Sequence, residues 1–304
     1  MTRTRAIIVG APRSGTTTLW RQLTNHPDIA SSKVKELNYL HDPRLAETDY
    51  DSHFGPGGKV TLEASPVYFR EHTAVTPRIA ETFPQARLIF ILREPAARLL
   101  AGYRSARDWD HNIARNVSFL DFVRIIAEDR DPLPIYPTDR ARAIYASDAK
   151  KVGIYSDILA HFLEFFSPEQ IHILFLDDLQ LDPHGALADL CLHLGVDPEA
   201  FPSVPIQTEN QGVEISNLRF YLIARRINAL AEPLLNRAPS LRRAMRRIHH
   251  AINARPADRS SEEVRIALSL ARNWYTQANH DLAVLLSNHF PSVSLPTWLT
   301  EEEN

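Results

Sequence analysis

An apolar run that leads into a glycine-rich turn constrains the fold of this chain more than any other feature. Residues 6–9 (AIIV) predict a buried strand, residues 10–15 a tight loop, and residues 16–25 the helix that follows. Such a strand–loop–helix unit presents backbone N–H groups and the positive end of a helix dipole to an anion. The alternative is a plain turn into a helix capped by Ser14. The apolar strand, the glycines and the threonine run together favour a phosphate-binding loop.

The same loop argues against ATP as the ligand. Gly10 and Gly15 have the spacing of the Walker A pattern G-x-x-x-x-G-K-[ST], but Thr16 stands where the lysine belongs. No apolar strand ends in an acid suited to hold magnesium, because Asp177 and Asp178 begin a turn and a helix. A P-loop kinase is therefore the less favoured alternative.

The order of apolar runs and helical patterns predicts an α/β fold, with a parallel sheet flanked by helices. Strands are expected at residues 6–9, 60–62, 87–92 and 171–176, and helices at 16–25, 74–83, 95–107 and 155–166. Ligands of such sheets bind beyond the carboxyl ends of the strands, where residues 11–17 and Arg93 fall. We expect one domain over residues 1–304. Its core would cover about 5–200, with an irregular insertion near 108–137, and a mostly helical C-terminal portion would cover about 201–304.

Composition narrows the class of protein. The 304 residues are 44% hydrophobic and carry a formal net charge of −3, which fits a globular protein and does not suggest a nucleic-acid partner. The single cysteine, Cys191, excludes an internal disulfide and lies in an apolar pattern, so a buried thiol is expected. No apolar stretch approaches the roughly 18 residues of a membrane span, and the first apolar run is too short for a signal peptide. A cytoplasmic location is the resulting expectation.

Five segments, in order, resemble the sulfotransferases that use 3′-phosphoadenosine 5′-phosphosulfate (PAPS), in particular the carbohydrate or heparan-type and bacterial members. GAPRSGTTTLWRQLTNHPDI (10–29) is similar to the 5′-phosphosulfate loop, and LIFILREPAARLLAGYRSA (88–106) to the 3′-phosphate motif. KELNYLHD (35–42) resembles the K-E-x-H-F-F element, and LEASPVYF (62–69) the E-x-[ST]-P-x-Y-F segment. Residues 152–183 match the later helix–strand–turn stretch. The resemblance implies a P-loop-like fold, PAPS as donor without a metal, and sulfuryl transfer to a hydroxyl or amino group of a glycan or glycosylated small molecule.

The resemblance also implies which residues bind the donor. Arg93 would hold the 3′-phosphate, unless it only forms a salt bridge with Glu94 or a neighbouring acid. Ala101 stands where the family has a serine, and Ser105 could compensate. The 5′-phosphosulfate would be held by Arg13, Ser14, Gly15, Thr16, Thr17 and Thr18, and the nucleotide pocket completed by Tyr155, Gln211 and Gly212.

Catalytic roles follow from the same comparison. Glu36 would be the base that takes the acceptor's proton, or else an exposed loop acid without a role. Lys35 would balance charge at the sulfuryl group, and Arg13 would stabilise the leaving phosphate. His41 is the second choice as base, and Glu63 a possible carboxylate for orienting the substrate.

Departures from the family pattern keep another interpretation open. Asn38 replaces the family's histidine, Ala64 stands where the animal heparan-type members have a lysine, and Ala101 lacks the serine hydroxyl. A nucleotide-binding module that has lost catalysis is therefore a third hypothesis.

Two further segments suggest contacts with an acceptor. Residues 237–255 hold six arginines and no acid and predict a basic amphipathic helix. It would face an anionic membrane surface or a polyanionic acceptor, or be an ordinary solvated face. Residues 108–111 (DWDH) follow the 3′-phosphate helix and could line an acceptor cleft.

Overall fold

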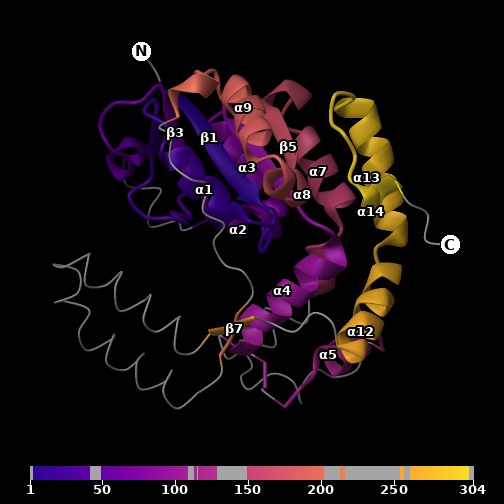
Figure 1. The fold of residues 1–304 in the computed structure, drawn as a ribbon. Helices are drawn as coiled ribbons and strands as arrows, with labels where there is room; N and C mark the ends of the chain where they lie inside the picture. The colour runs from indigo at the N-terminus through magenta and orange to yellow at the C-terminus, as the bar shows by residue number, and fades with distance from the viewer. Residues whose placement is uncertain are drawn as a thin grey trace.

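The computed structural model describes residues 3–41, 49–108, 113–114, 116–128, 149–201, 213–215, 254–256 and 261–300. Its centre is a five-stranded parallel sheet in the order β2-β3-β1-β4-β5 (Figure 1). The predicted α/β fold is confirmed, and β2 is an additional strand whose three residues carry too short a pattern to be recognised. The strands are β1 Thr4–Gly10, β2 Ile29–Ser31, β3 Val60–Ala64, β4 Arg87–Leu92 and β5 Ile171–Phe175.

Helices cover both faces of this sheet, as its apolar strands require. On one face the side chains of Ala6 and Ile8 pack with those of α1, α8 and α9. Cys191 lies in this cluster and is fully buried, which confirms the expected structural thiol; burial raises its pKa to about 11. The bounds are α1 Thr16–Thr24, α8 Leu176–Leu181 and α9 Pro183–Leu194.

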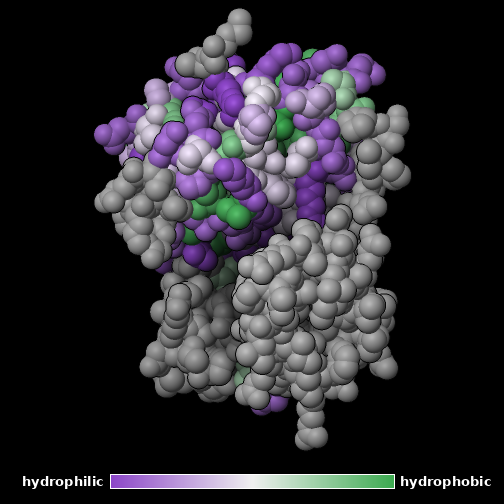
Figure 2. Space-filling view, turned by 90° about the vertical axis from the view of Figure 1, so that its left-hand side faces the viewer, coloured by the Kyte–Doolittle hydropathy of each residue, from purple (hydrophilic) through white to green (hydrophobic). Residues whose placement is uncertain are grey.

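The opposite face packs Ile7 and Val9 against a larger cluster rich in aromatic residues. Figure 2 shows that the described surface seen from this side is mainly hydrophilic, with a smaller apolar area. The helices on this face are α2 Val67–Arg70, α3 His72–Thr82, α7 Tyr155–Leu163 and α13 Thr276–His289, followed by α14 Thr297–Thr300.

A third apolar cluster lies away from the sheet, where α4 (Pro95–Asp108) packs with α5 (Phe119–Ala127) and α12 (Glu262–Asn273). These three helices lie below the sheet in Figure 1, and α4 connects them to the end of β4. The expectation that residues 108–137 are irregular is therefore wrong for α5. Ser118 and Asp121 form a capping box at its start, which is a signal of a helix N-terminus that the sequence does carry.

The C-terminal portion is helical in α12, α13 and α14, but it also contains strand. The three-residue strands β6 (Val213–Ile215) and β7 (Ala254–Pro256) pair in antiparallel fashion. The predicted basic helix thus does not extend to residue 255, and residues 237–253 lie outside the described part. The remaining elements are 3₁₀ turns at Tyr50–His53, Pro168–Gln170 and Pro198–Ala200. Within the described residues, every helix is too short or too polar to cross a membrane.

Two half-buried histidines at the β5 edge of the sheet make stability depend on pH. The rings of His172 on β5 and His193 on α9 are 5.2 Å apart, and burial lowers the pKa of each to about 4. The unfolded chain takes up these protons near pH 6.5, so stability is expected to fall as pH drops from about 6.5 to 4, with a slope of up to about 1.4 kcal/mol per pH unit from His172. Urea unfolding across this range measures the slope. His172→Gln should flatten it, whereas His280→Gln on the exposed side of α13 should not; equal slopes in all three proteins would contradict the prediction.

Candidate active site

The predicted phosphate loop connects β1 to α1 at the carboxyl edge of the sheet. The Ala11 N–H donates to the Ile91 carbonyl of β4 at 2.8 Å, which fastens the start of the loop to the neighbouring strand. Arg13 then adopts a left-handed conformation, with φ of 67°, and Gly15 follows with φ of 97°. Successive N–H groups in such a turn form a concave binding site for an anion.

The two glycines of the loop are required by the structure and not only by local turn preference. A Cβ atom on Gly10 would lie 2.5 Å from the Cβ of Phe69, and one on Gly15 would lie 2.8 Å from Leu176 Cδ1. Phe69 belongs to α2 and is the last residue of the LEASPVYF segment. This segment therefore packs against the predicted phosphate loop at Gly10. Leu176 comes from the start of α8.

The side chains of the loop supply hydroxyl groups around this backbone. Ser14, Thr16 and Thr18 are buried, Thr17 is half-buried and Arg13 is exposed. Ser14 Oγ lies beside the Tyr155 hydroxyl without a hydrogen bond of good geometry and is a buried polar atom without a partner. The first turn of α1 contains no acidic residue, so the N–H groups at its start face no carboxylate of their own helix. This composition suits an anionic ligand.

Arg93 lies beside this loop, as its place after β4 predicts. Its Nη1 donates to the Arg13 carbonyl at 3.3 Å, so two arginines from neighbouring strand ends meet at one edge of the sheet. Glu94 acts on the backbone instead. Its carboxylate accepts the N–H groups of Ala96 at 3.0 Å and Ala97 at 2.6 Å and so caps α4. This capping fixes the backbone that follows Arg93.

Tyr155 contacts both the loop after β1 and the residue that follows β4. Its side chain is buried, and its hydroxyl donates to the Arg93 carbonyl at 2.9 Å. Burial raises the pKa of Tyr155 to about 12, although the charge of Arg98 and the nearby Ser14 hydroxyl act in the opposite direction. Tyr155 thus remains a neutral donor that holds the Arg93 backbone in place, and its contact with a nucleotide stays a prediction.

For the other residues predicted to complete the nucleotide pocket, the structure gives only their place on α4, or they lie outside the described part. Ala101 lies on α4 and is partly exposed, while Ser105, one turn further along, is buried. Gln211 and Gly212 lie outside the described residues, as do residues 109–111 of the predicted acceptor cleft.

The Lys35–Glu36 pair lies on the segment that crosses the carboxyl end of β3. Lys35 Nζ is 2.7 Å from Glu36 Oε1, with side-chain exposures of 16% and 56%. The Glu36 N–H donates to the Ala64 carbonyl at 3.0 Å, which ties the segment to the end of β3. β3 is hydrogen-bonded to β1, so the predicted base lies at the same edge of the sheet as the phosphate loop.

Glu63 does not have the predicted position, since it is fully buried and cannot contact an acceptor. It lies opposite Ile7 of β1, with its side chain in a cluster of hydroxyl groups. Ser65 Oγ donates to its Oε2 at 3.0 Å, Tyr50 to its Oε1 at 3.2 Å, and the Tyr68 hydroxyl is 3.4 Å from both oxygens. Burial raises the pKa of Glu63 to about 7, against the opposing effect of these hydroxyls. The sequence did not reveal that these hydroxyls are the partners of Glu63, although Glu63, Ser65 and Tyr68 all lie in the LEASPVYF segment.

Two of the residues that depart from the family pattern, Asn38 and Ala64, lie close to Glu36 and Glu63 in the chain. Asn38 has a left-handed backbone with φ of 55°, and its Oδ1 is buried without a hydrogen-bond partner. Ala64 is fully buried, and its carbonyl accepts the Glu36 N–H. His41, the second choice as base, is exposed one turn after Asn38.

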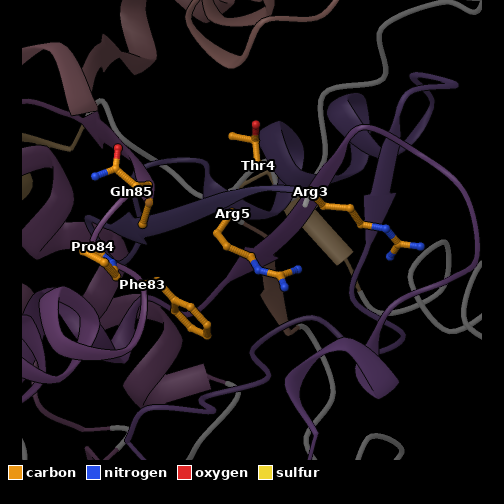
Figure 3. Close-up of a pocket in the computed structure, with 7 residues that line it drawn as sticks. Arg3, Thr4, Arg5, Phe83, Pro84 and Gln85 are labelled. Atoms are coloured by element: carbon orange, nitrogen blue, oxygen red, sulfur yellow. The ribbon is translucent and has the colours of Figure 1, made fainter. Parts of the chain in front are cut away.

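An open cavity of about 240 Å³ lies at the opposite edge of the sheet (Figure 3). It is formed where β1 and β4 begin and is therefore remote from the phosphate loop. Among the described residues, no group of three or more histidine, cysteine, aspartate or glutamate side chains is arranged to hold a metal. The cavity is lined by Arg3, Thr4, Arg5, Phe83, Pro84, Gln85 and Ala86.

Several known proteins with similar sequences or a similar fold are sulfotransferases. The bifunctional heparan sulfate N-deacetylase/N-sulfotransferase of Drosophila melanogaster is 26% identical over 214 residues, which are 63% of this chain and 20% of that protein. Human heparan sulfate glucosamine 3-O-sulfotransferase 5 is 25% identical over 192 residues, 59% of this chain and 49% of the relative. This chain therefore spans between a fifth and a half of these relatives. The crystal structure of a sulfotransferase from Alicyclobacillus acidocaldarius has the same fold, with a TM-score of 0.54 at 22% identity, covering 79% of this chain and 96% of that one.

The family model described as "Sulfotransferase domain" matches residues 3–211, more than two thirds of the chain. The matched region contains the phosphate loop, Lys35–Glu36, the Glu63 cluster, Arg93 and Tyr155, and ends inside the stretch predicted to complete the nucleotide pocket. The chain therefore belongs to the sulfotransferase domain family.

Proposed function

We propose that the protein transfers a sulfuryl group from PAPS to a hydroxyl or amino group of a glycan or glycosylated small molecule. The observation that carries this proposal is the 3.3 Å contact between Arg93 Nη1 and the Arg13 carbonyl, which puts the cationic side chain of Arg93 beside the loop that contains Arg13. PAPS carries a 5′-phosphosulfate and a separate 3′-phosphate, so it needs two anion sites. The Ser14–Thr18 run with Arg13 suits the first, and Arg93 suits the second.

The residues of the loop fit the 5′ end of this donor. Backbone N–H groups and the threonine hydroxyls would hold phosphosulfate oxygens without a lysine. The reaction forms a bond from the acceptor oxygen or nitrogen to sulfur and breaks the sulfur–oxygen bond to the 5′-phosphate, which keeps the electron pair. Arg13 and the loop N–H groups would stabilise the charge that this phosphate gains, and such preorganised donors often supply the largest share of catalysis.

Glu36 would take the acceptor's proton as the new bond forms. Its carboxylate is the more exposed member of the Lys35–Glu36 pair, so it can be reached by an acceptor from solution. Lys35, 2.7 Å away, would hold it in position and add positive charge near the transferred group. The heparan sulfate enzymes among the relatives support a glycan as acceptor.

Two measurements on the wild-type protein test the proposal. Isothermal titration with adenosine 3′,5′-bisphosphate (PAP), the desulfated product, should show one site of micromolar or tighter affinity without magnesium. A mass-spectrometric screen with PAPS against glycans, phenols and glycolipids should find an acceptor that gains one sulfuryl group. Absence of PAP binding would contradict the proposal, and magnesium-dependent ATP binding would favour a kinase. Tight PAP binding without turnover of any acceptor would indicate a module that has lost catalysis.

A further inference from the structure

The segment that carries Lys35 and Glu36 has an unfavourable backbone that must be held in place. Glu36 and Asn38 both lie in the left-handed region, with φ of 63° and 55°. Residues with side chains avoid this region, and they persist there only where surrounding contacts enforce it. The position of the predicted base therefore depends on what holds these two residues.

Three backbone N–H groups fasten this segment to β3, to the turn after β3 and to α2. The Glu36 N–H donates to the Ala64 carbonyl at 3.0 Å. The other two donate to side chains: Asn38 N–H to Ser65 Oγ at 3.0 Å, and Leu40 N–H to the Tyr68 hydroxyl at 2.9 Å. Two of the three attachments thus depend on hydroxyl groups.

The orientation of those hydroxyls depends in turn on Glu63. A hydroxyl has one proton to donate and lone pairs to accept. Ser65 Oγ directs its proton to Glu63 Oε2 at 3.0 Å, and the Tyr68 hydroxyl, 3.4 Å from both carboxylate oxygens, directs its proton to the same group. Their lone pairs are then left for the N–H groups of Asn38 and Leu40. This arrangement is complete when the Glu63 carboxyl is ionised and has no proton to donate, that is, above its raised pKa of about 7.

We infer that Glu63 is a positioning residue for catalysis, which acts through Ser65 and Tyr68 to hold the segment 36–40 and so to aim the Glu36 carboxylate. This inference rests on the proposed function, because it assigns Glu63 to the same reaction. It replaces the predicted direct contact between Glu63 and the acceptor, which full burial prevents. The three hydroxyls also offset the cost of burying this carboxylate, which would be large if it were unpaired.

Three conservative variants separate positioning from simple stability. Tyr68→Phe and Ser65→Ala each remove one hydroxyl that accepts a segment N–H. Tyr50→Phe is the matched control, because the Tyr50 hydroxyl also donates to Glu63, at 3.2 Å, but accepts none of the three segment N–H groups, and its ring contact with Tyr39 is retained. We expect kcat to fall at least about tenfold in Tyr68→Phe and Ser65→Ala, since small displacements of a reacting group are costly. We expect kcat to stay within about twofold of the wild type in Tyr50→Phe, and PAP affinity to be unchanged in all three.

Hydrogen exchange gives a readout that does not require activity. The amides of Asn38 and Leu40 should exchange faster in Tyr68→Phe and Ser65→Ala than in Tyr50→Phe or the wild type. Glu63→Gln, which keeps the size of the side chain but has only one acceptor oxygen, should give the same loss of protection and of kcat as Tyr68→Phe.

The outcomes distinguish this inference from the proposed function. An active wild type in which Tyr68→Phe and Ser65→Ala keep their kcat, or lose no more than Tyr50→Phe, overturns the inference alone. Unchanged exchange at Asn38 and Leu40 overturns it as well. A wild type that neither binds PAP nor transfers a sulfuryl group contradicts the proposed function, and the inference fails with it.

Discussion

Replacing Glu36 by glutamine is expected to lower kcat about 10²–10⁴-fold while leaving PAP affinity unchanged, because a positioned general base contributes a factor of this size. Glutamine keeps the size of the side chain and an acceptor oxygen, but it cannot take the acceptor's proton. The residues proposed to bind PAPS lie on the loops after β1 and β4, whereas Glu36 is attached to the end of β3. Steady-state turnover with PAPS, together with titration of PAP, measures both quantities.

Glu81→Gln is the matched control for this change. Glu81 is exposed near the end of α3, just before the turn that leads into the start of β4, and so lies toward the opposite edge of the sheet. It should turn over like the wild type. If Glu36→Gln keeps wild-type turnover, Glu36 is not the base and His41→Gln becomes the next variant to measure. Turnover by the Glu36→Gln or the Glu81→Gln variant would exclude the hypothesis that the protein binds the nucleotide but has lost catalysis.

Replacing Arg93 by alanine is expected to weaken PAP binding about 10- to 150-fold, since hydrogen bonds to charged groups contribute about 1.5–3 kcal/mol. The change removes the guanidinium that the 3′-phosphate motif provides directly after β4, while Tyr155 would still hold the backbone at this position. Isothermal titration without magnesium measures the change, and thermal unfolding shows whether the variant remains folded.

Arg87→Ala provides a control on the same strand. Arg87 begins β4 and Arg93 follows its end, so the two arginines are about 20 Å apart at the strand's rise per residue. Arg87 donates to the Glu169 carbonyl, away from the phosphate loop. Its removal should leave PAP affinity unchanged. Equal losses in both variants, or none in Arg93→Ala, would place the 3′-phosphate elsewhere.

Much of the fold could be predicted from local patterns, and the elements show why. The runs at residues 6–9 and 88–92 are apolar throughout because parallel strands are buried on both faces, so β1 and β4 were recognisable without knowing their partners. The glycine loop and Arg93 follow strands whose carboxyl ends must lie at one edge of the sheet. Their proximity was therefore predictable, and the Arg93–Arg13 contact agrees with it. Short or capped elements were harder: β2 has three residues, and α5 is marked mainly by its capping box.

The sequence by itself thus determined four of the five strands, the glycine loop and the end of the sheet at which the loop lies, because apolar runs, glycine spacing and chain order are local properties. Only the tertiary structure decided that Glu63 is buried. An acid in a strand can face solvent or the core, and its burial depends on Tyr50 and Tyr68, which approach from other elements. The left-handed backbone at Glu36 was also invisible, because it is enforced by bonds to residues about 28 positions away in the chain. Hydrogen bonds between residues so far apart in the chain leave no local sequence pattern. The contacts that hold the predicted base in place are therefore seen only in the folded structure.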